Sequence, residues 1–507
     1  MTYRFAVAGS ASAIALLSAG AATAEVTAQE VWDLWAGSFE LYGDSVVTYD
    51  EPVMDGDALV ISNMTMTMSE VDATVVSEMG EIRLVNNGDG TVAIEMPEEI
   101  RFVFSPHSEI REDDQAVLVV SYGNLETTVS GEAGALVFDF SADRQEMALE
   151  SLTVEGEAIE GVAQLAINGV SGTYGLREGD LIEYDGDMAA ASVEILVDYD
   201  LPEMGNVLFL SGRLDQLALD FDIAVPADFD SSVPPEEMAT IFQDGLAVAI
   251  GYSTGTVAYM FNVDDGFAPA SGTASAGSSE TSFNIDVDSA GYSTRVTDMA
   301  LAIESSDLPF PVEISAREYG LGIDVPLSSS DEPVDFSASV NITDLAINDM
   351  IWSMFDPQGQ ISRDPATMIV DISGTAKLLF DILDPAQAEA LAVAAVPGEL
   401  HSLNLDDLRI SIAGGELTGG GAFTFDNSDL QTFGGMPRPE GQVGLKLTGG
   451  NGLLDTLVAM GFVGDSEAMQ ARMMMGMFAN ATGDDTLETT VEVNSQGHLI
   501  VNGQRLQ

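Results

Sequence analysis

The 507-residue chain carries 83 Asp and Glu residues against 16 Lys and Arg residues, which gives a formal net charge of −67. Only 20% of its residues are charged and 46% are hydrophobic, so the imbalance reflects missing bases in a chain that can bury a core. Because nucleic-acid binding requires clustered Lys and Arg, and only Lys377 and Lys446 are lysines, the composition excludes that class of partner.

Three explanations of the negative charge remain open. The first is solubility in a salty medium, where screening limits self-repulsion. The second is binding of divalent cations, and the third is attraction of a basic partner. The absence of cysteine excludes disulfides and thiolate metal sites.

The N-terminus predicts a secretory signal peptide over residues 1–24. Arg4 precedes an apolar run too short to span a bilayer comfortably, and Ala22-Thr23-Ala24 forms a small-residue cleavage signal before Glu25. We therefore expect a periplasmic protein, with full export left open. No later stretch holds 18 uncharged apolar residues, so we expect no transmembrane span in the mature chain.

The mature chain is expected to open with an amphipathic helix in VTAQEVWDLWAGSFELYGD. Thr27 and Glu30 fit a capping box, and Gly43 suits the end of the helix. The two Trp residues of this segment are expected to dock the helix on a core.

From about residue 44 to residue 340, apolar and polar residues alternate, which predicts antiparallel strands with one buried face and one solvated face. Turn chemistry is expected at residues 86–90 and at Asp185-Gly186-Asp187, and a helix near residues 234–245. A loop or linker rich in small residues is expected at 267–280. It separates a helix plus antiparallel β domain (25–266) from a β domain with C-terminal helices (281–507).

Helices return in the last third of the sequence. DMIWSMFDP is helix-like, and Asp384, Pro385 and Gln387 suit the start of a helix in DPAQAEALAVAAV. The segments NGLLDTLVAMGFV and SEAMQARMMMGMFAN predict a helical hairpin before two closing strands. The expected fold class is mainly β (α+β): a long antiparallel meander sheet, possibly curved, with an N-terminal helix and a C-terminal helical hairpin.

Between residues 413 and 506, four stretches resemble an uncharacterised domain-of-unknown-function family of secreted alphaproteobacterial proteins: AGGELTGGGAFTFDN, GLLDTLVAMGFV, MMMGMFAN and GDDTLETTVEVNSQGHLIVNGQRL. The signal peptide and the opening TAQEVWDLW also fit this family. The resemblance implies location and length, but no activity. The closing strands, with their Gly and Asn-Gly turns, also resemble more loosely the ends of β-rich envelope proteins that hold lipid on long curved sheets.

The sequence offers no catalytic constellation. GYSTG at 251–255 matches Gly-x-Ser-x-Gly, but a strand-like segment follows where a nucleophile elbow requires a helix, so we interpret it as part of a hairpin. His107, His401 and His498 are too widely spaced for a metal motif. GGELTGGG at 414–421 lacks the Lys of a phosphate loop.

The acidic turns of the sequence leave a calcium site open. The segments 55–57, 185–187 and 262–266 carry oxygen ligands, but none follows the twelve-residue calcium loop, and solvated turns explain them equally well. Otherwise we predict no cofactor.

Methionine, with 23 residues, is the unusual apolar feature. Two sets share one strand face and one helix face, respectively: Met64, Met66 and Met68, and Met469, Met473 and Met477. Three interpretations remain: ordinary core, an adaptable apolar groove, and a Cu(I) site of thioethers.

We therefore expect a non-enzymatic periplasmic binding or envelope-associated protein that holds an apolar ligand, such as a lipid, on a concave sheet. The alternatives are a periplasmic hydrolase that uses a carboxylate pair and an acidic interaction protein that binds an envelope protein partner.

Overall fold

The computed structural model describes residues 25–39, 46–69, 73–107, 114–201, 206–227, 229, 238–264, 266–384, 386–394 and 396–506. The expected signal peptide at 1–24 and the helix-ending Gly43 lie outside these residues.

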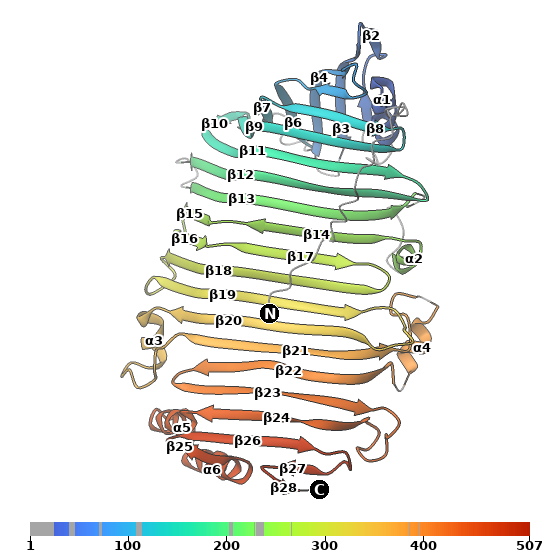
Figure 1. The fold of residues 1–507 in the computed structure, drawn as a ribbon. Helices are drawn as coiled ribbons and strands as arrows, with labels where there is room; N and C mark the ends of the chain where they lie inside the picture. Colours follow the sequence, from blue (N-terminus) through green and yellow to red (C-terminus); the bar gives the residue numbers. More distant parts are fainter. Residues whose placement is uncertain are drawn as a thin grey trace.

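Within the described ranges, 28 strands form one antiparallel sheet, which extends from the N-terminal strands at the top of Figure 1 to the C-terminal strands at the bottom. The expected fold class, mainly β with an N-terminal helix and a C-terminal helical hairpin, is confirmed. The N-terminal elements are α1 (Ala28–Ser38), β1 (Val46–Thr48), β2 (Val53–Asp55), β3 (Ala58–Ser69), β4 (Ala73–Asn86), β5 (Val92–Glu95), β6 (Glu99–Pro106), β7 (Gln115–Gly123), β8 (Glu126–Glu132), β9 (Ala135–Val154) and β10 (Glu157–Ile159).

The middle of the molecule holds the longest strands. Its elements are β11 (Gly161–Glu178), β12 (Leu181–Leu201), β13 (Asn206–Pro226), α2 (Met238–Gln243), β14 (Ala247–Thr254), β15 (Val257–Asp264), β16 (Ala270–Ala276), β17 (Ser279–Ile285), β18 (Ser289–Ser305), β19 (Val312–Pro326) and β20 (Val334–Ile347). The pairs β14–β15 and β16–β17 are each one long strand with a short break, because β13 pairs with both β14 and β15, and β18 pairs with both β16 and β17.

The C-terminal part combines strands with four helices among the described residues. Its elements are α3 (Asp349–Phe355), β21 (Ala366–Leu378), α4 (Ala388–Val393), β22 (Gly398–Ile412), β23 (Gly415–Asp426), β24 (Arg438–Thr448), α5 (Gly450–Ala459), α6 (Asp465–Phe478), β25 (Asn480–Gly483), β26 (Thr486–Val493), β27 (Leu499–Val501) and β28 (Gln504–Arg505). Helices α3, α5 and α6 lie beside the strand ends on one side of the sheet, and α2 and α4 lie beside the strand ends on the other side (Figure 1).

The buried core lies at the N-terminal end. Thr27 and Glu30 form the expected capping box of α1, and Val31 and Trp32 pack against the apolar side chains of β3, β4, β5, β8 and β9. Trp32 also makes an edge contact with Tyr49, with ring centroids 4.9 Å apart. The prediction that this helix docks on a core is confirmed.

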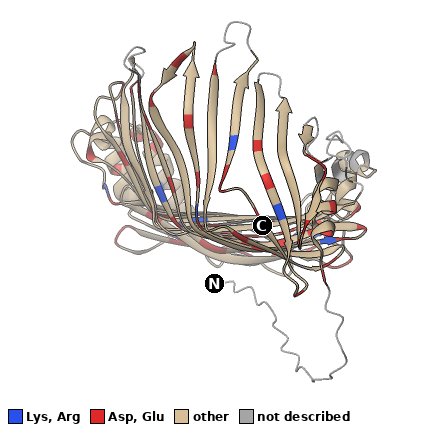
Figure 2. Ribbon diagram, turned by 90° about the horizontal axis from the view of Figure 1, so that it is seen from above, with Lys and Arg blue, Asp and Glu red and all other residues tan. Residues whose placement is uncertain are grey.

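The long strands bend along a line that crosses the sheet. In β13, Leu210, Gly212 and Leu214 share a face, and the next side chain on that face is Leu217, so one extra residue interrupts the alternation. Gln216, beside this interruption, has a left-handed backbone (φ 55°). The neighbours β12 and β14–β15 carry an extra residue at the same level, so the register stays constant. We call this line the crease; Figure 2 shows the sheet bent into a trough.

Several local predictions were wrong. The segment 267–280 is not one continuous loop: β16 occupies residues 270–276 and β17 begins at Ser279, because small residues pair with larger partners; Gly272, for example, lies opposite Phe261. Asp185-Gly186-Asp187 lies within β12 and not in a turn, and Gly186 there faces Tyr174, which leaves little room for a side chain.

GYSTG lies in one arm of a long hairpin, as expected: β14–β15 pairs with β16–β17, and GYSTG runs from β14 into the break at the crease. The helix expected from Asp384 begins at Ala388, because Asp384 accepts hydrogen bonds from the Ala386 amide and the Gln387 side chain in a turn that precedes it. The helices expected near residues 234–245, in DMIWSMFDP and in the C-terminal hairpin are present as α2, α3, α5 and α6 in the part of the chain that the structure describes.

Candidate apolar groove

One row of directly paired residues crosses the trough without a charged side chain. It begins at Phe138 and Tyr174, whose rings stack 4.6 Å apart next to the core. It then passes from each strand to the next through Gly186, Phe221, Ile250, Phe283, Tyr292, Ile323, Ala338, Ile372, Leu405, Gly421, Val443 and Val491.

The adjacent row has the opposite character. Since successive side chains on a strand point to opposite faces, the residue before or after each row member points away from it. That second row contains Asp185, Asp222, Asp324 and Glu492 among small and amide residues. The two faces of the sheet therefore differ in charge along its whole length.

The same division holds on both sides of the crease. On the other side, Ile195, Gly212, Tyr259, Ala274, Leu301, Ile314 and Ile347 form a second uncharged row across consecutive strands. From β12 to β26, no paired position on this face that the structure describes is occupied by Asp, Glu, Lys, Arg or His. We call this surface the apolar face and the opposite surface the charged face.

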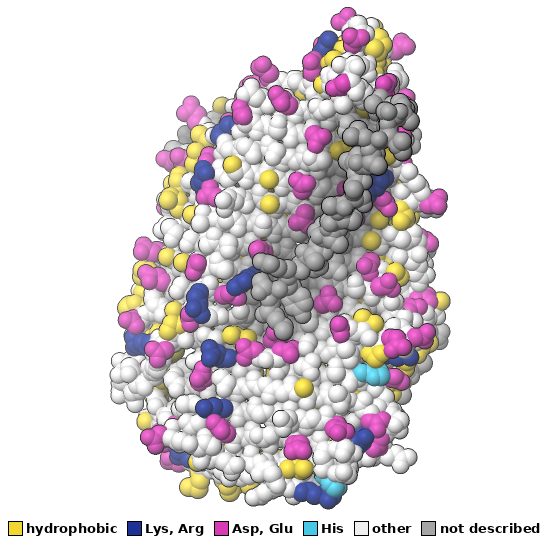
Figure 3. All heavy atoms as spheres, viewed as in Figure 1, with side chains coloured by type: hydrophobic (Ala, Val, Ile, Leu, Met, Phe, Trp, Pro, Cys, Tyr) yellow, Lys and Arg dark blue, Asp and Glu magenta, His cyan; other side chains and the backbone are white. Residues whose placement is uncertain are grey.

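The apolar face lies on the concave side of the trough. Acidic side chains and a few bases are spread over the convex side, which is the side viewed in Figure 3. Register then places the uncharged rows on the other, concave side. Several of their large side chains stay well exposed, including Tyr252, Phe283, Tyr292, Leu321 and Ile323. An apolar surface of this extent in contact with solvent is a candidate binding site.

Aromatic–glycine pairs form much of the floor of this surface. Tyr259 lies opposite Gly212, Phe261 opposite Gly272, and in each case a Cβ on the glycine would collide with the ring. The same pairing joins Tyr199 to Gly161, Phe140 to Gly172 and Phe336 to Gly374. Each ring thus lies across the neighbouring strand, where it covers backbone and keeps the floor low and smooth.

An apolar hollow on this face has a volume of about 420 Å³ and straddles the crease. Its side chains come from both sides, with Val296 before the crease and Met299, Leu301, Ile314 and Leu345 beyond it. The two uncharged rows therefore belong to one continuous surface.

The few hydroxyl groups on the apolar face satisfy each other across strands. Thr254 and Ser279 hydroxyls lie 2.7 Å apart, and those of Thr281 and Thr294 lie 2.9 Å apart. Burial raises the pKa of Tyr199, which keeps its phenol neutral. The face consequently offers no charge to a ligand.

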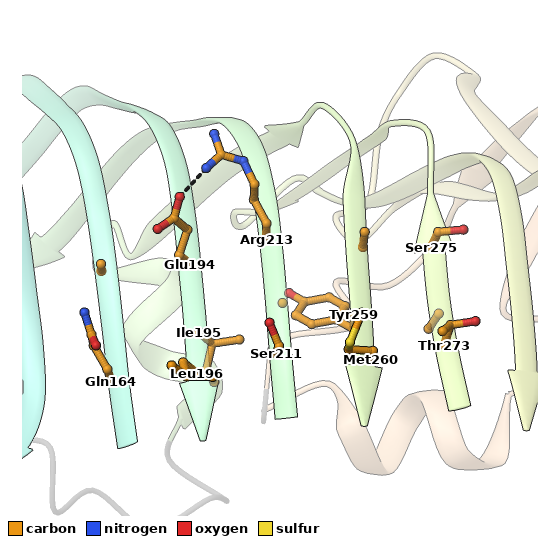
Figure 4. Close-up of a pocket in the computed structure, with 14 residues that line it drawn as sticks. Gln164, Glu194, Ile195, Leu196, Ser211, Arg213, Tyr259, Met260, Thr273 and Ser275 are labelled. Carbon is orange, nitrogen blue, oxygen red and sulfur yellow. Dashed lines mark hydrogen bonds and ion pairs between the residues drawn. The ribbon is translucent and has the colours of Figure 1, made fainter. Parts of the chain in front are cut away.

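A second hollow, of about 480 Å³, is lined mainly by charged-face residues of β11, β12, β13, β15 and β16 (Figure 4). The guanidinium of Arg213 pairs with Glu194 on the neighbouring strand (Figure 4) and with Asp215, 2.7 Å away. A hydrogen bond from Thr256, together with Arg213, lowers the pKa of Asp215. Arg213 is thus occupied by acids on its own strand and on the neighbouring strand, which is the pairing typical of a structural ion pair.

The structure separates the two predicted methionine sets. Met64 is 4% exposed and packs in the N-terminal core, with Met66 and Met68 further along β3. Met469 is 72% exposed, and Met473 and Met477 are similarly exposed on α6, at the other end of the sheet (Figure 1). The two sets therefore do not line one site.

The remaining sequence candidates do not converge. His107 is hydrogen-bonded to Thr74, His401 lies 3.5 Å from Glu399, and His498 lies near Asn494. Among the residues that the structure describes, no cluster of three His, Cys, Asp or Glu residues is arranged to hold a metal ion. Asp265, within the calcium candidate 262–266, lies outside the described residues. None of the described helices has the length and apolarity required to cross a membrane.

Sequence reasoning missed the residues that line the groove, since the methionines that it proposed lie elsewhere. The signal was present: the alternation of apolar residues changes phase once in most long strands, as between Leu214 and Leu217. A phase change that keeps the apolar residues on one face indicates a bulge and a bent sheet, and not the end of a strand.

These features define a class of protein: a single-layer antiparallel sheet, bent along a crease, with an uncharged concave face and a charged convex face. Residues 263–503 match the sequence model of a family described as an uncharacterised protein conserved in bacteria, DUF2125. The predicted resemblance to a domain-of-unknown-function family is confirmed over this part of the chain. No curated protein and no solved structure matches the chain.

Proposed function

We propose that this protein is a non-enzymatic lipid-binding protein of the bacterial cell envelope, which acts in the periplasm after its signal peptide is removed. The observation that carries the proposal is the uncharged row from Phe138 to Val491 on the concave face. Hydrocarbon chains need an extended surface without charge, since burying an unpaired charge against them is costly.

The length of the row suggests the kind of ligand. From Gly186 to Val491 the row crosses twelve strands, and at about 4.8 Å between strands it extends roughly 50 Å. The hydrocarbon core of a bilayer is about 30 Å thick, so an acyl chain that spans one leaflet would cover only part of the groove. The proposal is therefore for several acyl chains bound along the trough, with their headgroups toward its open side.

A pair of adjacent substitutions tests the proposal. Phe283 is 41% exposed on the apolar face, and its neighbour Ser282 points to the charged face, where it pairs with Ser293. We expect Phe283→Glu to weaken binding of a fluorescent polyene fatty acid by about ten-fold or more, because the new carboxylate must be desolvated against the chain. Ser282→Glu adds the same charge to the other face and should leave binding unchanged.

Binding is measured by titration of the purified, delipidated full chain, and lipid carried through purification is identified by mass spectrometry. Unfolding midpoints of both variants show whether they remain folded. Equal affinities of the two variants, or no binding by the wild-type chain, would contradict the proposal. Turnover of ester or glycoside substrates by the wild-type chain would favour the hydrolase alternative instead.

A further inference from the structure

The helical hairpin α5–α6 presents an apolar surface to solvent next to the C-terminal end of the groove. Met469, Met473 and Met477 follow one another at four-residue spacing on α6, and each is more than 60% exposed. Phe462, in the turn between the two helices, is also exposed. On the opposite side of α6, Ala468 is buried. The helix thus has a packed side and a methionine side.

Helix α5 of this hairpin packs against the apolar face of the sheet. A Cβ on Gly415 of β23 would lie 3.3 Å from a methyl group of Leu453 in α5, and one on Gly450 would lie 2.6 Å from a methyl group of Leu447 of β24. Gly415 and Leu447 both belong to the apolar face. The other end of the groove differs, because Phe138 is buried there beneath the α1 core. The groove is therefore covered at its N-terminal end and lies beside α5 and α6 near its C-terminal end (Figure 1).

Charge narrows the choice of partner. Between residues 450 and 478 the only base is Arg472, and its guanidinium pairs with Asp455 of α5. Asp465 and Glu467 add negative charge at the start of α6. The hairpin cannot neutralise an anionic surface, but its flexible thioether side chains suit a fluid apolar one. Helix α3, on the same edge of the sheet, adds exposed Met350 and Met354 (Figure 1).

We propose that the methionine side of α6 docks on a lipid bilayer with zwitterionic headgroups, and that acyl chains pass between this bilayer and the C-terminal end of the groove. The proposal rests on the lipid-binding function proposed above. It assigns docking and storage to different residues, so the two can be tested separately.

The test uses flotation of the full chain with phosphatidylcholine vesicles. We expect the triple variant Met469→Gln, Met473→Gln, Met477→Gln to float about five-fold less than the wild-type chain, because the helix loses its apolar contact with the bilayer. A matched triple variant, Met54→Gln, Met260→Gln, Met436→Gln, changes three exposed methionines elsewhere and should float normally. Binding of the fluorescent fatty acid in solution should be unchanged in both.

Each alternative outcome is decisive. Normal flotation of the α6 variant, or no flotation of a wild-type chain that binds the fatty acid, would overturn docking and leave the groove intact. Loss of fatty-acid binding by the α6 variant would show that α6 is part of the groove and not a separate docking surface. Stronger flotation with phosphatidylglycerol vesicles would overturn the charge argument.

Discussion

Glycine sets the depth of the groove at the level of single residues. Where Tyr259 lies over Gly212, the ring occupies the space that a side chain on Gly212 would need. This arrangement buries backbone under an aromatic ring and compensates for the weak strand propensity of glycine. The smooth floor of the apolar face is therefore a property of residue pairs on neighbouring strands.

We expect Gly212→Val to lower the free energy of unfolding by about 1–3 kcal/mol, because the new side chain displaces Tyr259 and approaches Ile195. The control is Gly444→Val in β24, where a Cβ has no neighbour nearer than 4.0 Å. Denaturant unfolding measures both. Combining Gly212→Val with Tyr259→Ala should recover part of the loss, and a double variant no better than the single one would count against the ring contact.

At the level of elements, the crease depends on extra residues that lie opposite each other on neighbouring strands. In β13 and β14–β15 the pairing Leu214↔Val257 before the crease and Ala218↔Ser253 after it follow the same register. An extra residue on one strand alone would bring apolar residues opposite charged-face residues. The bend is thus a cooperative feature of several strands.

Deletion of Gln216 tests this dependence. The deletion would move Leu219 from its partner Tyr252 to Ser253. The apolar side chains in one half of β13 would then lie opposite charged-face residues of both neighbouring strands. We expect a chain that is recovered mainly as aggregate, or that unfolds at a markedly lower temperature. Gln216→Gly keeps the residue count and relieves the left-handed backbone, so it should fold with equal or slightly greater stability. A deletion variant with wild-type stability would disprove the register argument.

Much at this level was predictable from the sequence. Thr27 and Glu30 identified α1, and strict alternation identified most strands, because both signals are local. The strand at 270–276 escaped prediction because Ala, Ser, Gly and Thr carry no strand signal of their own. They become strand residues through partners such as Phe261, which are close only in space.

At the scale of the whole molecule, the excess of acids over bases is concentrated on one face of the sheet. Acidic residues stand on the convex side, and the few bases there pair with acids: Arg295 contacts Glu318, and Lys446 contacts Glu488. A net charge of −67 on one layer of sheet makes self-repulsion a substantial cost.

We therefore expect the unfolding temperature to rise with ionic strength. The Debye length falls from about 30 Å at 0.01 M salt to about 10 Å at 0.1 M, so repulsion between acids on neighbouring strands is progressively screened. Thermal unfolding monitored by circular dichroism in increasing NaCl measures the effect, with sucrose as an uncharged control solute. An unfolding temperature that does not change over this range would argue that repulsion is not limiting.

The candidate groove was predictable only in outline. The alternation of apolar and polar residues predicted an apolar face. Met64 was proposed as a residue of the groove on that face, but it lies in the closed core. Burial and exposure of an apolar face have the same sequence pattern, since both place apolar side chains on one side of a strand. Only the arrangement of the sheet shows that Phe138 is covered whereas Phe283 is open.

Neighbouring strands carry the extra residues of the crease at the same level, and this arrangement bears on how the sheet could lengthen during evolution. A duplicated hairpin that carries its own extra residues would slot into the sheet and lengthen the trough by two strand spacings, roughly 10 Å, with the same cross-section. The tetrapeptide Gly-Tyr-Ser-Thr occurs in both β14 and β18, and Tyr252 and Tyr292 both stand on the apolar face. The number of strands thereby sets the length of the trough, while the pleat of each strand sets which side chains face into it.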